Sequence, residues 1–367
     1  MLTHRDWQAR TRRHLHRKFV VKKGGHDPYR LRFYPQVARC IRQVTVQGDL
    51  FGELLNSTLS DLALVDSLYI DCPRAQRPLL LSHAQIPHFP RITNLQLRGV
   101  YFRTWQDMAA TLSSLPCLSR LRIDLRESGY AIEGTVSPHV WREMRLPLEK
   151  LRIDLDPALI YPMQDAPRAI ATSGGASMKQ LSVNVEMHSG PYIARESKMN
   201  PCRINSYGPM MGFLLFPVST LQQLDLSANT TLDSVSLSFS WYWIPWRQSA
   251  LPANGVAIST FLSHFHSPCL RVLTFCIHIA TFDQDDHWLR YIDLGFFDLF
   301  AEPPISPLMT AESMERVATT AQNIKQFCLK LKFDFQINDK RYVEIEQQVK
   351  SQLPALTARG ILHVTRG

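Results

Sequence analysis

One pentapeptide, Leu-Arg-Ile-Asp-Leu, occurs twice in this chain, at residues 121–125 and again at residues 151–155. Each copy lies within a wider pattern. In this pattern a leucine follows an apolar residue by three positions, and a second apolar residue follows the leucine by two positions. Repetition of a short unit is typical of a solenoid, in which each unit buries its apolar side against its neighbours. The repeat therefore constrains the architecture strongly, and it favours a binding scaffold over a catalytic pocket.

Nine units with this pattern can be aligned on the leucine or its equivalent. Their central residues are Val44, Leu68, Leu95, Leu121, Leu151, Leu181, Leu224, Leu273 and Phe327. The first five intervals, of 24 to 30 residues, suit one short unit each, whereas the last three, of 43 to 54 residues, are too long for a simple unit. The long intervals therefore contain insertions or a further degenerate repeat.

Each unit is predicted to contain a short strand and a return segment. In Leu95-Gln96-Leu97 the two leucines point to the same side of an extended chain and face the core together. The apolar spacing becomes helical at residues 105–115, where Thr104 is a suitable N-cap. Further helices are predicted at residues 50–62, 256–265, 311–324 and 342–353. Strand, turn and helix in series make right-handed crossovers, which stack the strands in parallel.

Several segments resemble a known family. Residues 89–95, Phe-Pro-Arg-Ile-Thr-Asn-Leu, and residues 115–121, Leu-Pro-Cys-Leu-Ser-Arg-Leu, resemble the repeats of fungal F-box proteins with leucine-rich repeats, as do residues 353–360. Residues 221–229 are similar to the leucine-rich-repeat consensus, including its asparagine at Asn229. The resemblance implies the α/β class and an irregular leucine-rich-repeat solenoid, a horseshoe with parallel concave strands and outer helices.

Two regions are predicted. Residues 1–35 form a basic N-terminal helix or cap, and residues 36–367 form the solenoid with a C-terminal cap. Within the first region, the stretch from Asp6 to Phe19 resembles the last helix of an F-box, although the Leu-Pro opening and the first two helices of that module are missing. The F-box resemblance implies docking to the Skp adaptor of a cullin-type ubiquitin ligase. A basic helix that merely caps the first turn is the alternative.

The composition is that of an ordinary soluble domain, with 367 residues of which 45% are hydrophobic and 20% are charged. No apolar run approaches ~18 residues, so we expect no membrane span. The basic start is not a secretory signal peptide. Seven cysteines are dispersed without CxxC pairs, which is typical of a reducing compartment, and we predict a cytoplasmic or nuclear protein.

The net charge of +9 is concentrated at the N-terminus, because residues 1–42 contain 12 Lys and Arg against two Asp. This segment could contact phosphates, but no aromatic-interleaved module accompanies the charge, and nucleic-acid binding is the weaker alternative. No nucleotide-binding or nucleophile motif is present, and His264-x-His266-x-x-Cys269 fits no common zinc pattern. We therefore predict no cofactor, no metal and no enzymatic activity.

Two adjacent units carry charges at outward strand positions. These candidate partner-binding residues are Arg120, Arg122 and Asp124, followed by Lys150, Arg152 and Asp154. In parallel strands they would form columns of like charge about 5 Å apart, which is unfavourable without compensation. Two interpretations stay open: the aspartates pair with the basic residues on a solvated face, or the columns select an acidic or mixed-charge protein segment. Charge reversal at Arg122 and Arg152 is then expected to leave folding intact.

A second candidate surface is the aromatic run at residues 241–246, Trp-Tyr-Trp-Ile-Pro-Trp. Trp243 and Trp246 would anchor a partner if they are exposed, and the alternative is a core plug under a long loop. The predicted function is recruitment of a protein target, bound on the concave face, to a cullin-type ubiquitin ligase. A leucine-rich-repeat interaction scaffold with no ligase link is the second hypothesis.

Overall fold

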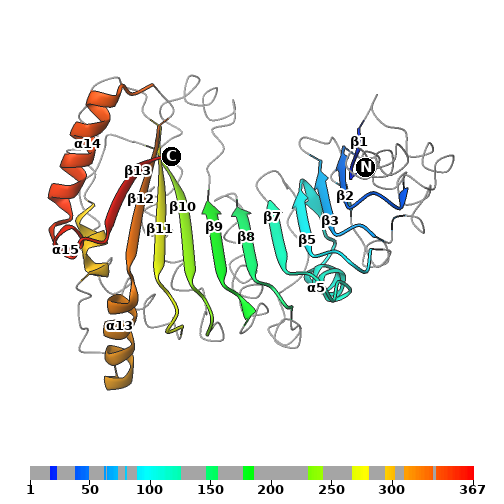
Figure 1. Cartoon of the computed structure of the whole chain (residues 1–367), viewed down its shortest axis with the longest axis horizontal. Helices are drawn as coiled ribbons and strands as arrows, with labels where there is room; N and C mark the ends of the chain where they lie inside the picture. The colour runs from blue at the N-terminus through cyan, green and yellow to red at the C-terminus, as the bar shows by residue number, and fades with distance from the viewer. Residues whose placement is uncertain are drawn as a thin grey trace, which may run out of the picture. The chain divides into compact units, whose positions relative to one another are not determined.

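The computed structural model describes residues 17–22, 38–48, 62, 64–72, 79–80, 89–124, 146–155, 177–185, 230–242, 267–280, 294–301, 310–333 and 336–367. The chain divides into two compact units, Met1–Gly175 and Ala176–Gly367. Each unit is of the α/β class and is built on parallel strands, which Figure 1 shows side by side within each unit. The predicted class and strand direction are therefore confirmed.

In the described part of the first unit, six strands follow one another in the sheet in their sequence order. They are β1 (Lys18–Val21), β2 (Gln43–Gln47), β3 (Ser67–Asp71), β5 (Asn94–Arg98), β7 (Arg120–Asp124) and β8 (Lys150–Leu155). Two shorter strands, β4 (Leu79–Leu80) and β6 (Val100–Tyr101), pair separately. Every pairing is parallel, so each chain segment between consecutive strands must cross back to the same end of the sheet.

The central residues of successive units lie in register, as the repeat predicted. Leu95 of β5 is opposite Leu68 on one side and Leu121 on the other, and Leu121 is opposite Leu151. A second apolar column lies two residues further on, and it includes Leu97 of β5. All of these side chains are 0–2% exposed. The two columns form the apolar spine of the first unit, in which burial of each large side chain contributes about 1.5–3 kcal/mol.

A tight turn precedes both β5 and β7 and explains the Pro-containing segments. The amide of Ile92 donates to the carbonyl of Phe89, and Leu118 donates to Leu115 in the same way. Proline at the second turn position supplies the required φ angle without losing a hydrogen bond. Just before the next strand, the carbonyl of Thr93 accepts from the amides of two consecutive residues at 3.0 and 2.8 Å, which fixes the register of neighbouring units.

The predicted helix after β5 is confirmed as α5 (Trp105–Ser113). Thr104 and Asp107 form a capping box, in which each side chain accepts a hydrogen bond from the other residue's backbone amide. Met108, Ala109 and Leu112 are 0–3% exposed and make up the buried side of the helix. Helical spacing and a local cap were sufficient to predict this element.

Among the residues described in the second unit, five parallel strands again follow one another in sequence order. They are β9 (Gln180–Val185), β10 (Ser234–Tyr242), β11 (Val272–Ala280), β12 (Gln326–Phe333) and β13 (Leu362–Arg366). Phe275 of β11 and Phe327 of β12 pack against Phe297 and Phe300 of a 3-10 helix, η4 (Gly295–Phe300), with ring centroids 4.7–5.7 Å apart. This aromatic cluster is the core of the unit near its last strands.

Three helices belong to the end of the chain: α13 (Ala311–Asn323), α14 (Asp339–Gln352) and α15 (Pro354–Ala358). The first two confirm the helices predicted at residues 311–324 and 342–353. The Asp298 carboxylate accepts the backbone amides of Ala355 and Leu356 at 2.9 Å and so caps α15. Arg359 donates to the carbonyls of Ala321 and Ile324, where α13 ends. These contacts attach the C-terminal segment to the rest of the unit.

Two expectations need correction. Lys18–Val21 is strand β1, parallel to β2, so the predicted N-terminal helix does not extend to Phe19, and the sheet begins before residue 36. Strand β10 was not predicted, although Leu232, Val235 and Leu237 repeat the apolar spacing with valine at the centre. The unit centred on Val235 is therefore the degenerate repeat that was expected in the long intervals, and it lies between Leu224 and Leu273.

Other predictions lie outside the described residues. They are the helix at 256–265, the helix at 50–62 apart from Leu62, and the unit centred on Leu224. No helix in the described part of the chain has the length and apolar character needed to cross a membrane.

Candidate functional site

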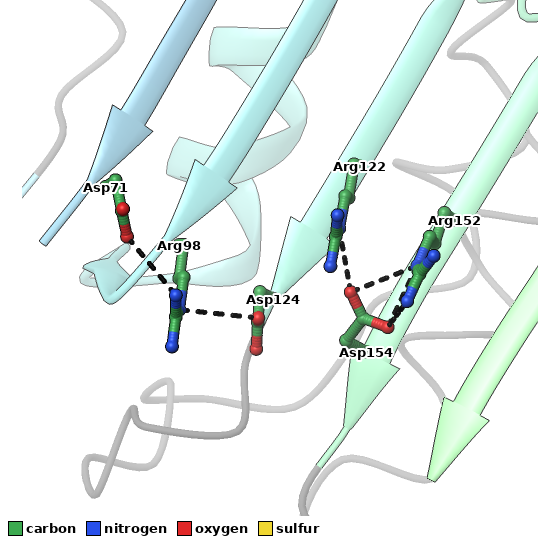
Figure 2. A network of polar contacts seen from close by, with 6 residues as sticks. All are labelled: Asp71, Arg98, Arg122, Asp124, Arg152 and Asp154. Atoms are coloured by element: carbon green, nitrogen blue, oxygen red, sulfur yellow. Dashed lines mark hydrogen bonds and ion pairs between the residues drawn. The ribbon is translucent and has the colours of Figure 1, made fainter. Parts of the chain in front are cut away.

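The predicted charge columns are present on β7 and β8, on the side of the strands opposite the apolar spine. Arg120 is in register with Lys150, Arg122 with Arg152, and Asp124 with Asp154. Because side chains alternate along a strand, all six belong to the same face. The sequence pattern therefore predicted the positions of these charges correctly, and Figure 2 shows four of them together with Asp71 and Arg98.

Asp154 is the centre of one ion-pair network. Its side chain is 0% exposed, while those of Arg122 and Arg152 are 33% and 44% exposed. The Nε of Arg122 donates to Oδ2 at 2.9 Å, and the Nε of Arg152 donates to Oδ1 and Oδ2 at 3.0 and 3.2 Å (Figure 2). One carboxylate thus offsets the repulsion between two adjacent guanidinium groups through charge-assisted hydrogen bonds.

A second network lies on the neighbouring strands. Arg98, the last residue of β5, is 3.7 Å from Asp71 of β3 and 3.7 Å from Asp124 of β7 (Figure 2). The Asp124 side chain is only 1% exposed. Opposite charges therefore alternate across β3, β5 and β7 at the last strand position. Asp71 and Arg98 were not predicted as site residues, although they occupy the strand position of Asp124 in the two preceding units.

These contacts decide part of the question that the sequence left open. Arg122, Arg152, Asp124 and Asp154 are paired within the chain, as the first interpretation supposed, but the two aspartates are buried and not solvated. The expectation that charge reversal at Arg122 and Arg152 leaves folding intact no longer holds. Both arginines compensate a buried carboxylate, and leaving such a charge unpaired is strongly destabilising.

Arg120 and Lys150 behave differently from the other charged residues of this face. Both are exposed, and neither side chain forms an ion pair or a hydrogen bond within the described part of the structure. They are register partners on adjacent parallel strands, so their Cα atoms are about 4.8 Å apart. The face therefore has a local excess of positive charge that its own carboxylates do not balance.

The residues beside this pair are neutral. Asn94 is in register with Arg120, and its side-chain amide donates to the hydroxyl of Tyr69 at 2.8 Å. Gln96 is in register with Arg122 and is half-buried. The free cations are therefore flanked by polar groups on the β5 side, and no additional carboxylate is available there among the described residues.

Most of the remaining candidate residues lie outside the part of the chain that the structure describes. Trp243 and Trp246 lie outside the described residues, as do His264 and His266, while Cys269 is exposed. Within the ranges that the structure describes, no group of three or more His, Cys, Asp or Glu side chains could hold a metal ion. The candidate functional site is therefore the charged face of β5, β7 and β8.

Comparison with known proteins adds no assignment: no family model matches the sequence, and no curated protein matches it. The fold and the site define the chain as a parallel α/β repeat protein with a partly unpaired cationic strand face.

Proposed function

We propose that this chain is a protein-interaction scaffold of the leucine-rich-repeat type, which holds a protein target on the face of β5, β7 and β8 that lies opposite the apolar spine. One observation carries the proposal. Every other charged side chain at the strand positions of this face has an ion-pair partner, whereas Arg120 and Lys150 are exposed and have none among the described residues. Like charges in register without compensation are unfavourable, and an acidic partner would relieve them.

The anatomy of the repeat supports the leucine-rich-repeat assignment. A tight turn, a buried apolar pair and a short parallel strand recur in successive units, with a capped helix after β5. In such repeats the strand positions that alternate with the core are available for binding, since each unit contacts only its neighbours. An irregular horseshoe with concave strands is the arrangement that we propose for the chain.

The ligase link is a further part of the proposal, and it depends on the F-box resemblance of residues 6–19. In that case the bound target would be brought to a cullin-type ubiquitin ligase through the Skp adaptor, in the cytoplasm or nucleus. One observation favours the scaffold without a ligase link. The end of the F-box-like stretch, at Phe19, belongs to strand β1 of the sheet and is buried.

Affinity purification from a fungal cell extract tests both parts. The bait is the tagged full chain, compared with Arg120→Glu/Lys150→Glu and with a charge-matched control, Arg39→Glu/Arg103→Glu, whose arginines are exposed and have no ion-pair partner among the described residues. We expect specific proteins to be retained by wild type and control and lost from the site variant, as measured by quantitative mass spectrometry.

Recovery of the Skp adaptor with these proteins supports the ligase link, and their recovery without it supports the plain scaffold. Identical sets of proteins on all three baits would contradict binding at this face.

A further inference from the structure

Four basic side chains come together on β7 and β8 and are called the cation cluster: Arg120, Arg122, Lys150 and Arg152. Among the described residues, the only carboxylate that forms ion pairs with them is Asp154, which is fully buried. The exposed part of the cluster is therefore entirely cationic. A ligand that approaches this part of the sheet meets several donors and a surplus of positive charge.

The donors that remain can be counted from the hydrogen bonds. A guanidinium group has five N–H donors. Arg122 uses its Nε on Asp154, and its two terminal nitrogens make no contact among the described groups. Arg152 uses Nε and Nη2 on the same carboxylate, which leaves Nη1. These remaining nitrogens, together with the side chains of Arg120 and Lys150, can donate hydrogen bonds end-on to the carboxylates of a ligand.

Asp154 gives the cluster its geometry. Arg122 and Arg152 are register neighbours, and two guanidinium groups at about 4.8 Å between strands repel each other. The buried carboxylate accepts the Nε of both arginines and the Nη2 of Arg152, and so fixes the positions of the two guanidinium groups. Asp154 is accordingly a positioning residue, which acts on a ligand only through the two arginines.

The spacing of the cluster favours an extended peptide over a nucleic acid. Side chains two residues apart along a strand, such as those of Arg120 and Arg122, are separated by about 7 Å. Acidic residues at alternate positions of an extended peptide have the same spacing, so the two sets of charges match. Proteins that bind nucleic acid typically contact more phosphates, on the order of 6–10, than this cluster could neutralise. The surplus here is confined to two strands.

We propose that the cation cluster binds an extended acidic segment of a partner protein, with carboxylates at alternate residues, and that Asp154 positions Arg122 and Arg152 for it. This inference rests on the proposed function and specifies the chemistry of the target. It makes affinity depend on the arrangement of the arginines as well as on their charge.

Fluorescence anisotropy with the full chain tests the binding. The probe is a labelled (Glu-Ser)4 peptide, and (Gln-Ser)4 and a 12-nucleotide single-stranded RNA are the comparison ligands. We expect saturable binding of the acidic peptide and none of the glutamine peptide. Arg120→Gln/Lys150→Gln is expected to weaken binding by about tenfold, since two exposed ion pairs are lost. The control Arg39→Gln/Arg103→Gln, with the same change in net charge, is expected to leave affinity unchanged.

Asp154→Asn separates positioning from simple charge attraction. The substitution makes the site more positive by one unit, so attraction alone predicts tighter binding of the peptide. Positioning predicts weaker binding, by about threefold to tenfold, because the arginines lose their common acceptor. The measurement is made well below the melting temperature of the variant. If Asp154→Asn does not fold, Arg122→Lys serves instead, and it is expected to weaken binding although the charge is kept.

Any one of the following results would overturn the inference: equal affinity for the glutamine and glutamate peptides, tighter peptide binding by a folded Asp154→Asn variant, or stronger binding of the RNA than of the acidic peptide. Unchanged affinity of Arg122→Lys would do the same. If the acidic peptide does not bind while Arg120→Glu/Lys150→Glu still abolishes target capture, the acidic chemistry is wrong and the proposed function stands. If neither effect is seen, both fail.

Discussion

Two double charge reversals should affect stability very differently, although they change the net charge equally. Arg122→Glu/Arg152→Glu removes the two arginines paired with Asp154, a carboxylate with 0% side-chain exposure, and places two more carboxylates beside it. Arg120→Glu/Lys150→Glu changes two exposed side chains that form no ion pair within the described residues. The pair of variants therefore isolates the structural role of Asp154 from the overall charge of the face.

The expected magnitude follows from burial. Removing one partner of a buried ion pair typically costs about 3–5 kcal/mol. The two arginines are themselves 33% and 44% exposed, so solvent screening reduces the effect, and we expect a loss near the lower end, about 3 kcal/mol. For a folding unit of this size, that loss lowers the melting temperature by roughly 6–12 °C. The reversal of Arg120 and Lys150 is expected to change stability by less than about 0.5 kcal/mol.

Thermal and urea denaturation of the full chain, followed by circular dichroism at low salt, measure both effects. Wild type and the two variants are compared at the same protein concentration and pH. Equal destabilisation by the two double variants, or wild-type stability of Arg122→Glu/Arg152→Glu, would refute the conclusion that these arginines compensate a buried carboxylate.

Three further substitutions test the fold. Leu121→Ala removes carbon atoms from a side chain that is 2% exposed, and urea denaturation is expected to show a loss of about 3 kcal/mol, against less than about 0.5 kcal/mol for Gln96→Ala on the opposite face. Asp298→Ala removes the cap of α15 and is expected to cost about 1–2 kcal/mol in the same assay. Tyr342→Phe is expected to be neutral or stabilising at pH 7, because the Tyr342 hydroxyl is buried without a hydrogen-bond partner among the described groups. Burial, followed by the charge of Glu346, raises the pKa of Tyr342 above its usual 10.0, so the folded state retains the phenolic proton more strongly than the unfolded state does. The contribution of Tyr342 to stability is therefore full below pH 10 and is lost as the pH rises through the raised pKa. The phenylalanine variant should lack this loss in denaturation curves measured at high pH.

The strands that could be predicted are those in which the apolar spacing is intact. Leu95, Leu121 and Leu151 lie side by side because each unit places its leucine at the same strand position, and this is a local property of the sequence. The capping box of α5 is local in the same sense. Local patterns therefore identified both the elements and their register.

Strands β1 and β10 were missed for two different reasons. β10, centred on Val235, lies in a long interval of the repeat in which Leu224 fits the same apolar spacing and was taken as the central residue instead. β1 follows a stretch whose basic residues and Trp favoured a helix, but pairing with β2 gives Lys18–Val21 an extended conformation. Tertiary context overrides a weak local preference in such cases.

The sequence by itself determined that the chain is a repeat of parallel strands. It also determined which side chains belong to the core and which charges lie in columns, because the position of a residue along its strand sets the face of the sheet on which it lies and its register with neighbouring strands. Only the tertiary structure decided that Asp124 and Asp154 are buried, that Arg122 and Arg152 share one carboxylate, and that Arg120 and Lys150 have no partner among the described residues. Burial and the choice of ion-pair partner depend on how side chains from different strands meet in space, and no spacing within one unit records this.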